Sequence, residues 1–278
     1  MTGKAMRFGI HLPQYGRAAS GEAVTRAARQ AEELGFEDVW VSDHLAVPTG
    51  ASYPPPFLYE PVITLTWAAA ATTRVGLGTS VLVLPYRHPL HLAKELASLD
   101  RFSGGRLVVG AAAGWLEGEF DALGVPFSER GARTNDTIDA LRACWERRPT
   151  NHDGPFFPLH DLQVLPQPER RIPIWVGGTS LAALHRAAAR GDGWHGNVDS
   201  DERLRDLVRQ LRELRPEESF TISTRAHWDG ISGDIDDYRR RVDVLADAGV
   251  QHLVLGPLQG DIDGWLKSVE ALAVGLIR

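Results

Sequence analysis

Short runs of apolar residues alternate with longer amphipathic segments from one end of the chain to the other. The short runs are rich in β-branched residues and bounded by turn residues, so each predicts a buried strand. The eight expected strands are Arg7–Leu12, Asp38–Ser42, Val75–Val81, Leu107–Ala112, Ile174–Val176, Gly193–His195, Thr221–Thr224 and Leu253–Leu255. The segments between them repeat apolar residues at a spacing of about 3.6, as Val24, Ala27, Ala28 and Ala31 do, which predicts helices. The eight expected helices are Glu22–Leu34, Pro61–Thr72, Pro89–Phe102, Thr134–Arg147, Leu181–Arg190, Asp201–Leu214, Ile235–Ala248 and Ile262–Leu276.

This alternation of strand and helix predicts an α/β fold built on a parallel sheet. Glycines close two of the expected helices at Gly35 and Gly249, and prolines open two others at Pro61 and Pro89. Eight units share 278 residues, about 35 residues each. Short strand–helix units that repeat without interruption favour a closed (β/α)8 TIM-like barrel over an open doubly wound sheet. We expect residues 1–278 to form a single domain.

Two connections are longer than the roughly 2–6 residues usual in such folds. The first, Leu45–Glu60, follows the second strand, so we expect it on the active face of the barrel as a wall or lid. The second, Arg148–Pro173, follows the fourth helix, and its short apolar runs around His160 and Asp161 predict a small hairpin at the side of the barrel.

Composition narrows the possible partners. Lys and Arg number 30 against 36 Asp and Glu, and a net charge of -6 argues against a nucleic-acid partner. A single cysteine rules out an intrachain disulfide and a thiolate metal cage, as is usual in a reducing cytoplasm. The most apolar stretch, Val62–Ala71, is well short of the roughly 20 residues that cross a bilayer, and Met1–Pro13 has no signal-peptide core. We therefore expect a cytoplasmic protein with no membrane partner.

In a barrel of this kind, catalytic residues stand at or just after the C-terminal ends of the strands. The residues there are His11, Gln14, Asp43, His44, Thr79, Ser80, Val81, Ala113, Gly114, Trp115, Gly177, Gly178, Thr179, Ser180, His195, Asn197, Arg225, His227, Trp228 and Gly256. Histidines, tryptophans, one arginine and several glycines that expose backbone predict a pocket for a flat aromatic ligand that carries an anion.

Other site types find little support. No His-x-His ends the first strand, so no metal site is expected. No Gly-x-Ser-x-Gly elbow of a serine hydrolase occurs. Gly76-Leu77-Gly78 lacks the third glycine and the acidic residue of a dinucleotide-binding fingerprint.

Three strand-end features each have a functional and a purely structural interpretation. The stretch Gly177–Ser180 opens a helix, where N–H groups and the helix dipole would bind a phosphate, or it is a tight turn with an ordinary cap. His44 follows Asp43, whose carboxylate could orient the imidazole for proton transfer, or it is a hydrogen-bonded loop histidine. His195 is either part of the pocket wall or a polar core residue.

A series of blocks in fixed order makes the picture more specific. The blocks are Phe8–Pro13, Val39–His44, Gly78–Leu82, Tyr86–Pro89, Ser103–Arg106, Gly114–Leu116, Trp175–Gly178 and Gly191–Trp194. Together they resemble the bacterial luciferase-like superfamily of flavin and deazaflavin proteins. They are most similar to its actinobacterial and mycobacterial branch of oxidoreductases that use coenzyme F420.

The resemblance implies a barrel that holds an isoalloxazine-type ring at its C-terminal mouth. It implies a non-proline cis peptide bond at Ser80–Val81 behind the ring, and His44 as the acid or base near the hydride-bearing carbon. It also implies that the phosphate binds at the turn that begins at Gly177. The cofactor-binding residues expected on this basis, with the neighbouring strand-end positions, are Asp43, Thr79, Ser80, Val81, Ala113, Gly114, Trp115, Val176, Gly177, Gly178, Thr179 and His195.

The chain departs from the family pattern at one position. Trp115 stands where the sugar-phosphate dehydrogenase branch has a catalytic glutamate, so a sugar phosphate is not the expected substrate. Glu117 and Glu119 follow shortly after. We expect them to be exposed on a loop, although an inward fold of that loop would bring one of them to the pocket.

The expected function is hydride transfer between F420 and a small organic substrate, with His44 handling the accompanying proton. The alternatives are an FMN-dependent monooxygenase and a non-catalytic flavin-binding protein. A homodimer is expected by resemblance and because two-fold assemblies are common.

Overall fold

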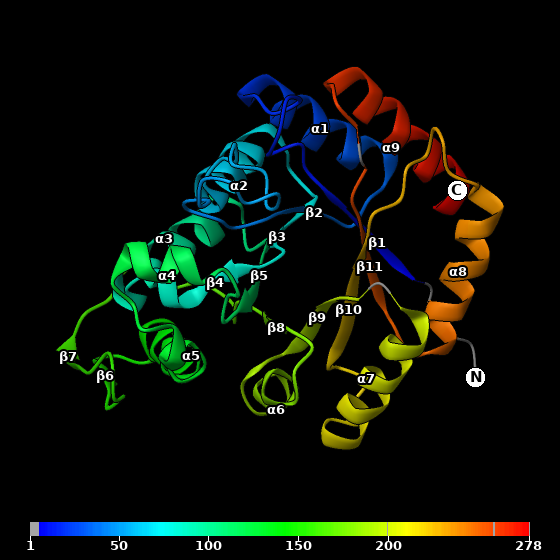
Figure 1. Ribbon diagram of the computed structural model, residues 1–278. Helices are drawn as coiled ribbons and strands as arrows, with labels where there is room; N and C mark the ends of the chain where they lie inside the picture. The colour runs from blue at the N-terminus through cyan, green and yellow to red at the C-terminus, as the bar shows by residue number, and fades with distance from the viewer. Residues whose placement is uncertain (1–5, 199, 258, 278) are drawn as a thin grey trace.

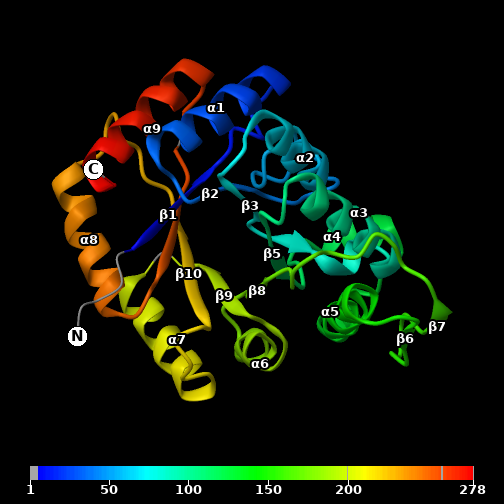
Figure 2. The same ribbon diagram turned by 180° about the vertical axis from the view of Figure 1, so that it is seen from behind.

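The computed structural model describes residues 6–198, 200–257 and 259–277, and within them eight parallel strands close into a barrel (Figures 1 and 2). The strands are β1 (Arg7–His11), β2 (Asp38–Val41), β3 (Gly76–Thr79), β5 (Leu107–Ala112), β8 (Ile174–Gly177), β9 (Gly193–Asn197), β10 (Thr221–Ala226) and β11 (His252–Leu255). They lie in the order β3-β2-β1-β11-β10-β9-β8-β5, and pairing of β3 with β5 closes the circle. The predicted (β/α)8 barrel is confirmed.

The strands are short and buried on both faces, which explains their continuous apolar runs. Inside the barrel the Trp40 ring stacks on Trp175 at 5.4 Å and on His195 at 5.0 Å between ring centroids. Gly78 makes this possible, because a Cβ there would lie 2.4 Å from Trp40 Cδ2. Large side chains thus fill the barrel beneath its mouth.

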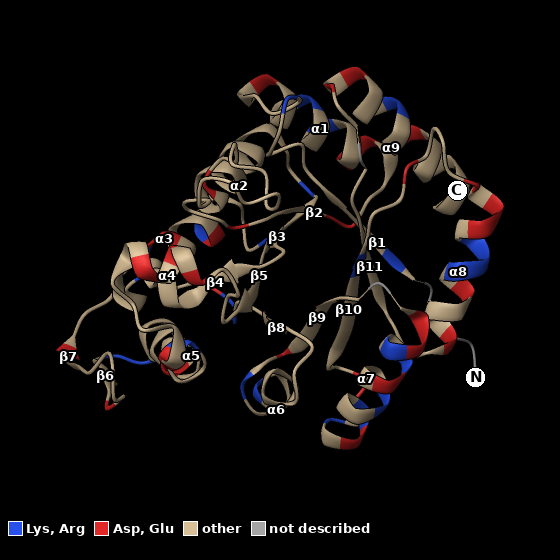
Figure 3. Cartoon of the chain, viewed as in Figure 1, with Lys and Arg blue, Asp and Glu red and all other residues tan. Residues whose placement is uncertain are grey.

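Helices surround the barrel, and charged residues recur along those such as α7 and α8 (Figure 3). The buried residues of α7 are all apolar, namely Leu204, Leu207, Val208 and Leu211. The long helices are α1 (Gly21–Leu34), α2 (Pro61–Ala71), α3 (Pro89–Phe102), α5 (Arg130–Glu146), α6 (Leu181–Arg190), α7 (Asp201–Leu214), α8 (Ile235–Asp247) and α9 (Ile262–Leu276). The α1 helix begins where Ser20 accepts a hydrogen bond from Ala23 N and ends at Gly35 in the left-handed conformation. Local capping therefore fixes the limits that the periodicity predicted.

The two long connections have different roles. Residues 45–60 pass over the barrel mouth, where Leu58 forms a β-bridge with Tyr15, so they form the wall that was predicted. In the second connection β6 (Thr150–His152) and β7 (Leu159–Leu162) pair in antiparallel fashion, which confirms the predicted hairpin. This hairpin lies beside α5 at the outer edge of the molecule (Figures 1 and 2).

The segment after β5 differs from the expected loop. The short strand β4 (Leu82–Val83) pairs with the end of β5, and helix α4 (Glu117–Leu123) follows β5. Phe120 of α4 is fully buried between Tyr86 of the turn η1 (Leu84–Tyr86) and Phe127 of the turn η2 (Phe127–Glu129). Seven helical residues give too short a periodic signal to be recognised in sequence, and the burial of Glu119 and Phe120 comes from tertiary contacts.

Candidate active site

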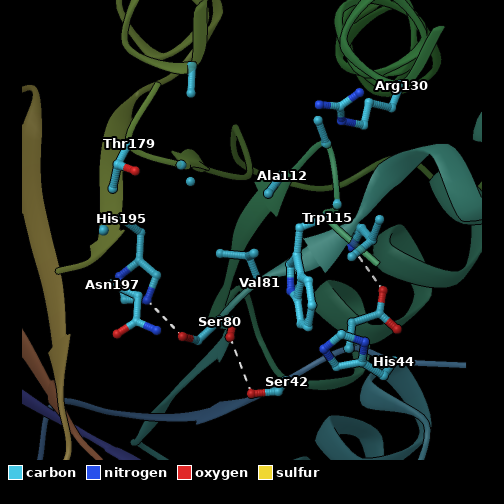
Figure 4. A pocket seen from close by; sticks show the side chains of 18 of the residues that line it. Ser42, His44, Ser80, Val81, Ala112, Trp115, Arg130, Thr179, His195 and Asn197 are labelled. Carbon is cyan, nitrogen blue, oxygen red and sulfur yellow. Dashed lines mark hydrogen bonds between the residues drawn. The ribbon is translucent and has the colours of Figure 1, made fainter. Parts of the chain in front are cut away.

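A cavity of about 620 Å³ opens at the C-terminal ends of the strands (Figure 4). Ser42, Ser80, Ala113, Gly177, Asn197 and Arg225, each at or within one residue of the end of a different strand, contribute to its wall. Tyr53, Pro54 and Pro55 of the connection after β2 complete one side. The volume is within the range of roughly 300–1,000 Å³ typical of cofactor and substrate sites.

The structure brings most of the predicted site residues to this one cavity. Those that line it are Asp43, His44, Ser80, Val81, Ala113, Gly114, Trp115, Gly177, Gly178, Thr179 and His195. Thr79 and Val176 are fully buried and lie outside its lining. The Thr79 hydroxyl donates a hydrogen bond to Gly110 O at 2.7 Å, so this side chain ties β3 to β5 and does not face the cavity.

His44 is held by Glu119 of helix α4. The distance between His44 Nδ1 and Glu119 Oε2 is 2.8 Å, and the backbone N–H groups of Leu45 and Ala46 donate to Oε1 at 2.6 and 3.1 Å. Tyr86 donates its hydroxyl proton to Oε2 at 2.8 Å. Burial alone would raise the pKa of Glu119, but these hydrogen bonds outweigh it and hold the pKa below its ordinary value. Glu119 is therefore ionised, so His44 donates from Nδ1 and keeps Nε2 for a ligand.

The expectation that Glu119 is exposed on a loop is therefore wrong, whereas Glu117 is exposed as expected. The turn of α4 that buries Phe120 also carries its neighbour Glu119 inward. The chain adopts the alternative considered from the sequence, in which this segment folds inward.

Asp43 does not orient His44. Its carboxylate accepts two hydrogen bonds from Arg87, at 2.6 and 2.9 Å, and one from Val83 N at 2.8 Å. Arg87 Nη2 also donates a hydrogen bond to Glu60 Oε1 at 3.0 Å. Burial lowers the pKa of Arg87, but the carboxylates of Asp43 and Glu60 together raise it above its ordinary value. Asp43 is thus a neutralised part of the wall that anchors the turn after β4.

Ser80 and Val81 form the floor of the cavity, and the peptide bond between them is cis, as the resemblance implies. Ser80 Oγ lies 2.8 Å from His195 Nε2, and a buried polar chain continues from His195 Nδ1 through Ser223 and His252 to Asp38. Burial lowers the pKa of His195 to about 3, and His252 and Arg225 add to this, so the ring is neutral. His195 accordingly fits both of its interpretations, because it lines the cavity and belongs to the polar core.

The turn after β8 presents backbone to the cavity. Gly177 ends the strand, Gly178 has a φ of 113°, and Ser180 caps helix α6 by accepting from Ala183 N. A Cβ on Gly177 would come within 3.1 Å of Val81 Cγ1. Gly177 and Val81 are therefore closely packed, and the backbone after Gly177 lines the cavity up to the start of α6, where an anion is favoured by the helix dipole.

Two arginines stand at the same end of the cavity. Arg186 of α6 donates to Asn135 Oδ1 at 2.6 Å and to Gly131 O at 3.1 Å, and Arg130 of α5 donates to Phe127 O at 2.9 Å. Neither forms an ion pair with a carboxylate among the described residues. Burial lowers the pKa of Arg186, and the positive charges of Arg190 and Arg130 lower it further. This end of the cavity is therefore cationic and suited to an anion.

Trp115 forms the rim, with 55% of its surface exposed. Its ring is nearly parallel to Tyr53, with an interplanar angle of 13° and 6.2 Å between centroids, and it meets His44 edge-on at 5.8 Å. Figure 4 shows Trp115 between Val81 and His44, facing the open cavity. An aromatic plane thus stands next to the histidine that carries an available nitrogen.

Sequence reasoning missed Arg130, Arg186 and the role of Glu119. The arginines lie within helices, where spacing alone does not separate a side chain that faces a cavity from the many that face solvent. Glu119 did carry a signal, since it follows the motif that contains Trp115, but only the fold of α4 shows which carboxylate turns inward.

Comparisons with known proteins place this geometry in a family. The family model for luciferase-like monooxygenase matches residues 6–228. An F420-dependent glucose-6-phosphate dehydrogenase of Kineococcus radiotolerans is 34% identical over 171 residues, which cover 60% of this chain and 50% of that protein.

Two solved structures share the fold over nearly their whole length. The monooxygenase RslO1 from Streptomyces bottropensis superposes with a TM-score of 0.85 at 23% identity, covering 98% of this chain and 99% of that one. The coenzyme F420 dependent tetrahydromethanopterin reductase from Methanopyrus kandleri gives 0.81 at 18% identity, with the same coverage.

Two further findings concern the described part of the chain. None of its helices has the length and apolar character needed to span a membrane. It contains no group of three or more His, Cys, Asp or Glu side chains that could hold a metal ion. The matched family model, together with the barrel and its mouth cavity, establishes that this chain belongs to the luciferase-like monooxygenase family.

Proposed function

We propose that this protein is an F420-dependent oxidoreductase that transfers a hydride between the deazaflavin and a small organic substrate. The observation that carries the proposal is the His44–Glu119 pair, which presents an imidazole nitrogen to a cavity whose far end attracts an anion. The F420-dependent enzymes among the similar proteins support the choice of cofactor.

The residues present fit a ring that carries a phosphate side chain. Val81 lines the cavity where the ring would lie, and Gly177 adds backbone to the same wall without a side chain that would crowd Val81. The backbone of Gly178 and Thr179, with Arg130 and Arg186, would hold the phosphate. When bound, the deazaflavin supplies or accepts the hydride.

The part of His44 is to move a proton. With Nδ1 donating to the ionised Glu119, Nε2 is the nitrogen that meets the substrate. In the oxidising direction Nε2 accepts the proton that the substrate loses as its hydride departs. In the reducing direction Nε2 donates that proton. Glu119 stabilises the positive charge on the ring in the protonated state, and Tyr86 holds Glu119 in place.

The cofactor choice is tested by titrating the protein with F420 and, separately, with FMN while following quenching of cofactor fluorescence. We expect F420 to bind at least about tenfold more tightly, a difference in binding free energy of about 1.4 kcal/mol. Tighter binding of FMN would contradict the proposal and favour the FMN-dependent monooxygenase.

The role of His44 is tested with His44→Gln. General acid–base catalysis contributes about 10²–10⁴-fold, so we expect kcat to fall within that range while F420 affinity stays within about twofold. Unchanged turnover would remove His44 from the reaction. Tight F420 binding with no turnover of any donor or acceptor by the wild-type protein would instead favour a non-catalytic binder.

A further inference from the structure

Arg225 is a buried arginine whose position in the cavity the proposed cofactor chemistry does not use. It lies in β10, is 7% exposed and lines the cavity. Its Nη1 donates to Ser42 Oγ at 3.0 Å, across the mouth at the end of β2. Its Nε is buried and has no hydrogen-bond acceptor. The guanidinium is thus only partly satisfied by the protein.

The surroundings of Arg225 supply no negative charge. Across residues 6–198, 200–257 and 259–277, no Asp or Glu forms an ion pair with it. The groups that interact with it include the Ser42 hydroxyl, the Tyr15 and Tyr53 hydroxyls, and the imidazoles of His11 and His195. Burial lowers the pKa of His11, and the charge of Arg225 lowers it further, so His11 is neutral. Arg225 therefore contributes a single uncompensated positive charge.

A second arginine near this mouth, Arg87, whose side chain is 13% exposed, is treated differently. Arg87 is paired with Asp43 and Glu60 at hydrogen-bonding distance. A buried charge is costly unless it is paired, and arginine stays protonated in proteins. The chain meets this requirement for Arg87 and leaves it unmet for Arg225, so the missing partner is expected to come from a ligand.

The shape of the site points to the kind of anion. A guanidinium edge binds a planar carboxylate through two parallel N–H···O hydrogen bonds. The Arg225 side chain lines the cavity together with Ser42 and Tyr15, so its guanidinium lies next to hydroxyl groups that can add hydrogen bonds to the same carboxylate. Arg225 supplies one positive charge, which matches the single negative charge of a carboxylate. The end of the cavity near Gly178 has two arginines and suits the higher charge of a phosphate.

We propose that Arg225, together with the Ser42 and Tyr15 hydroxyls, forms a subsite for a carboxylate of the substrate, so that this protein acts on organic acids. The inference rests on the proposed function, since it assumes that the cavity binds a substrate beside the cofactor. It adds the substrate class, which neither the cofactor nor the family match specifies.

The experiment compares benzoate with benzamide, which has the same shape but no charge, as ligands of the full-length protein by isothermal titration calorimetry. We expect benzoate to bind at least about tenfold more tightly, as a charge-assisted hydrogen bond in a buried site implies. Arg225→Gln should abolish this preference, and Arg225→Lys should retain part of it because it keeps the charge but loses the fork geometry. Arg209→Gln, at an exposed arginine of α7, is the matched control and should leave the preference unchanged.

Two outcomes would overturn the inference. One is the absence of a benzoate preference in the wild-type protein, or a preference that survives in Arg225→Gln. The other is a loss of F420 affinity of tenfold or more in Arg225→Gln with the benzoate preference intact, which would assign Arg225 to the cofactor. Thermal melting of each variant checks that it is folded.

The failure of this inference can be told apart from failure of the proposed function. The benzoate comparison needs no cofactor, and the F420 titration needs no substrate. A preference for benzoate without F420 binding would support the Arg225 subsite and contradict the proposed cofactor. F420 binding without a preference for benzoate would support the cofactor and contradict the subsite.

Discussion

Two sets of charged residues meet at the barrel mouth and differ in how the chain satisfies them. The paired cluster, made of Asp43, Arg87, His44 and Glu119, has every carboxylate matched by a cation or by N–H and O–H donors of the protein. The open arginines, Arg130, Arg186 and Arg225, form no ion pair with an acidic side chain in the part of the chain that the structure describes. The paired cluster builds the site, and the open arginines are available to a ligand.

The difference follows from the cost of burying charge. A buried ion that loses its partner destabilises a fold strongly, so groups that must stay in place without a ligand need partners from the chain itself. A group that binds an anion has to keep its donors free, and the fold tolerates the resulting cost. Substitutions in the paired cluster should therefore lower stability or turnover, whereas substitutions of the open arginines should weaken ligand binding and leave stability nearly unchanged.

The largest expected effect is that of Arg87→Gln on stability. Asp43 would keep its buried carboxylate but lose both hydrogen bonds from Arg87. We expect the free energy of unfolding to fall by about 3–5 kcal/mol. Denaturant unfolding followed by circular dichroism measures this, and adding Asp43→Asn should recover part of the loss. A loss below about 1 kcal/mol would show that the pair is not needed to hold the site.

Next is Glu119→Gln, which removes the charge opposite His44 but keeps the size of the side chain. We expect kcat to fall by about 10–100-fold, as is typical when a group that orients a functional histidine is removed. F420 affinity and substrate KM should change little, because Glu119 acts through His44. Glu117→Gln, in the first turn of the same helix, is the control. Equal effects of the two substitutions would contradict the pairing.

Arg186→Gln tests the open arginines at the phosphate end. Loss of one charge-assisted contact should weaken F420 binding by roughly tenfold. Stability should be nearly unchanged, because Arg186 has no carboxylate to leave unpaired. Fluorescence titration measures the affinity, with Arg209→Gln as the reference. An unaffected affinity would place the phosphate elsewhere.

Arg225→Met should leave the ligand-free protein as stable as the wild type or more stable, by up to about 1 kcal/mol. The substitution removes a buried charge that has no acidic partner among the described residues and puts an apolar side chain of similar length in its place. Thermal and denaturant unfolding measure the change. A clear destabilisation would indicate that the guanidinium has a structural partner and is not held open for a ligand.

The smallest expected effect is on the pH dependence of stability. The pKa of Glu119 is lower in the folded chain than its ordinary value of 4.5, so its contribution is present above that pH and is lost as the pH falls through the folded-state pKa. Glu119→Gln lacks this contribution. Its free energy of unfolding should therefore decline less than that of the wild type as the pH falls below 4.5. Parallel declines would contradict the shift.

Much of the architecture could be predicted because its signals are local. The apolar run of β2 and the helical spacing that begins at Val24 each need only a few neighbouring residues to be recognised. Strand ends then identified most of the cavity wall, including Ser80 and Gly177. Thr79 and Val176 were placed among them because strand limits are uncertain by a residue or two, and a shift of one residue turns a side chain to the other face.

Pairing across the fold could not be predicted. Asp43 was the natural partner for His44 because it is adjacent in sequence, yet the partner is Glu119, which is 75 positions away. Nothing in the spacing of Arg87 shows that it would take Asp43 instead.

The order of apolar and polar residues by itself determined the barrel, its helices and the edge at which the site lies, because each depends on short-range periodicity and on the one handedness that parallel units adopt. The tertiary structure alone decided which charges are paired and which are left for a ligand. That choice depends on distances between segments remote in the chain and on how deeply each group is buried, and neither quantity exists until the barrel has closed.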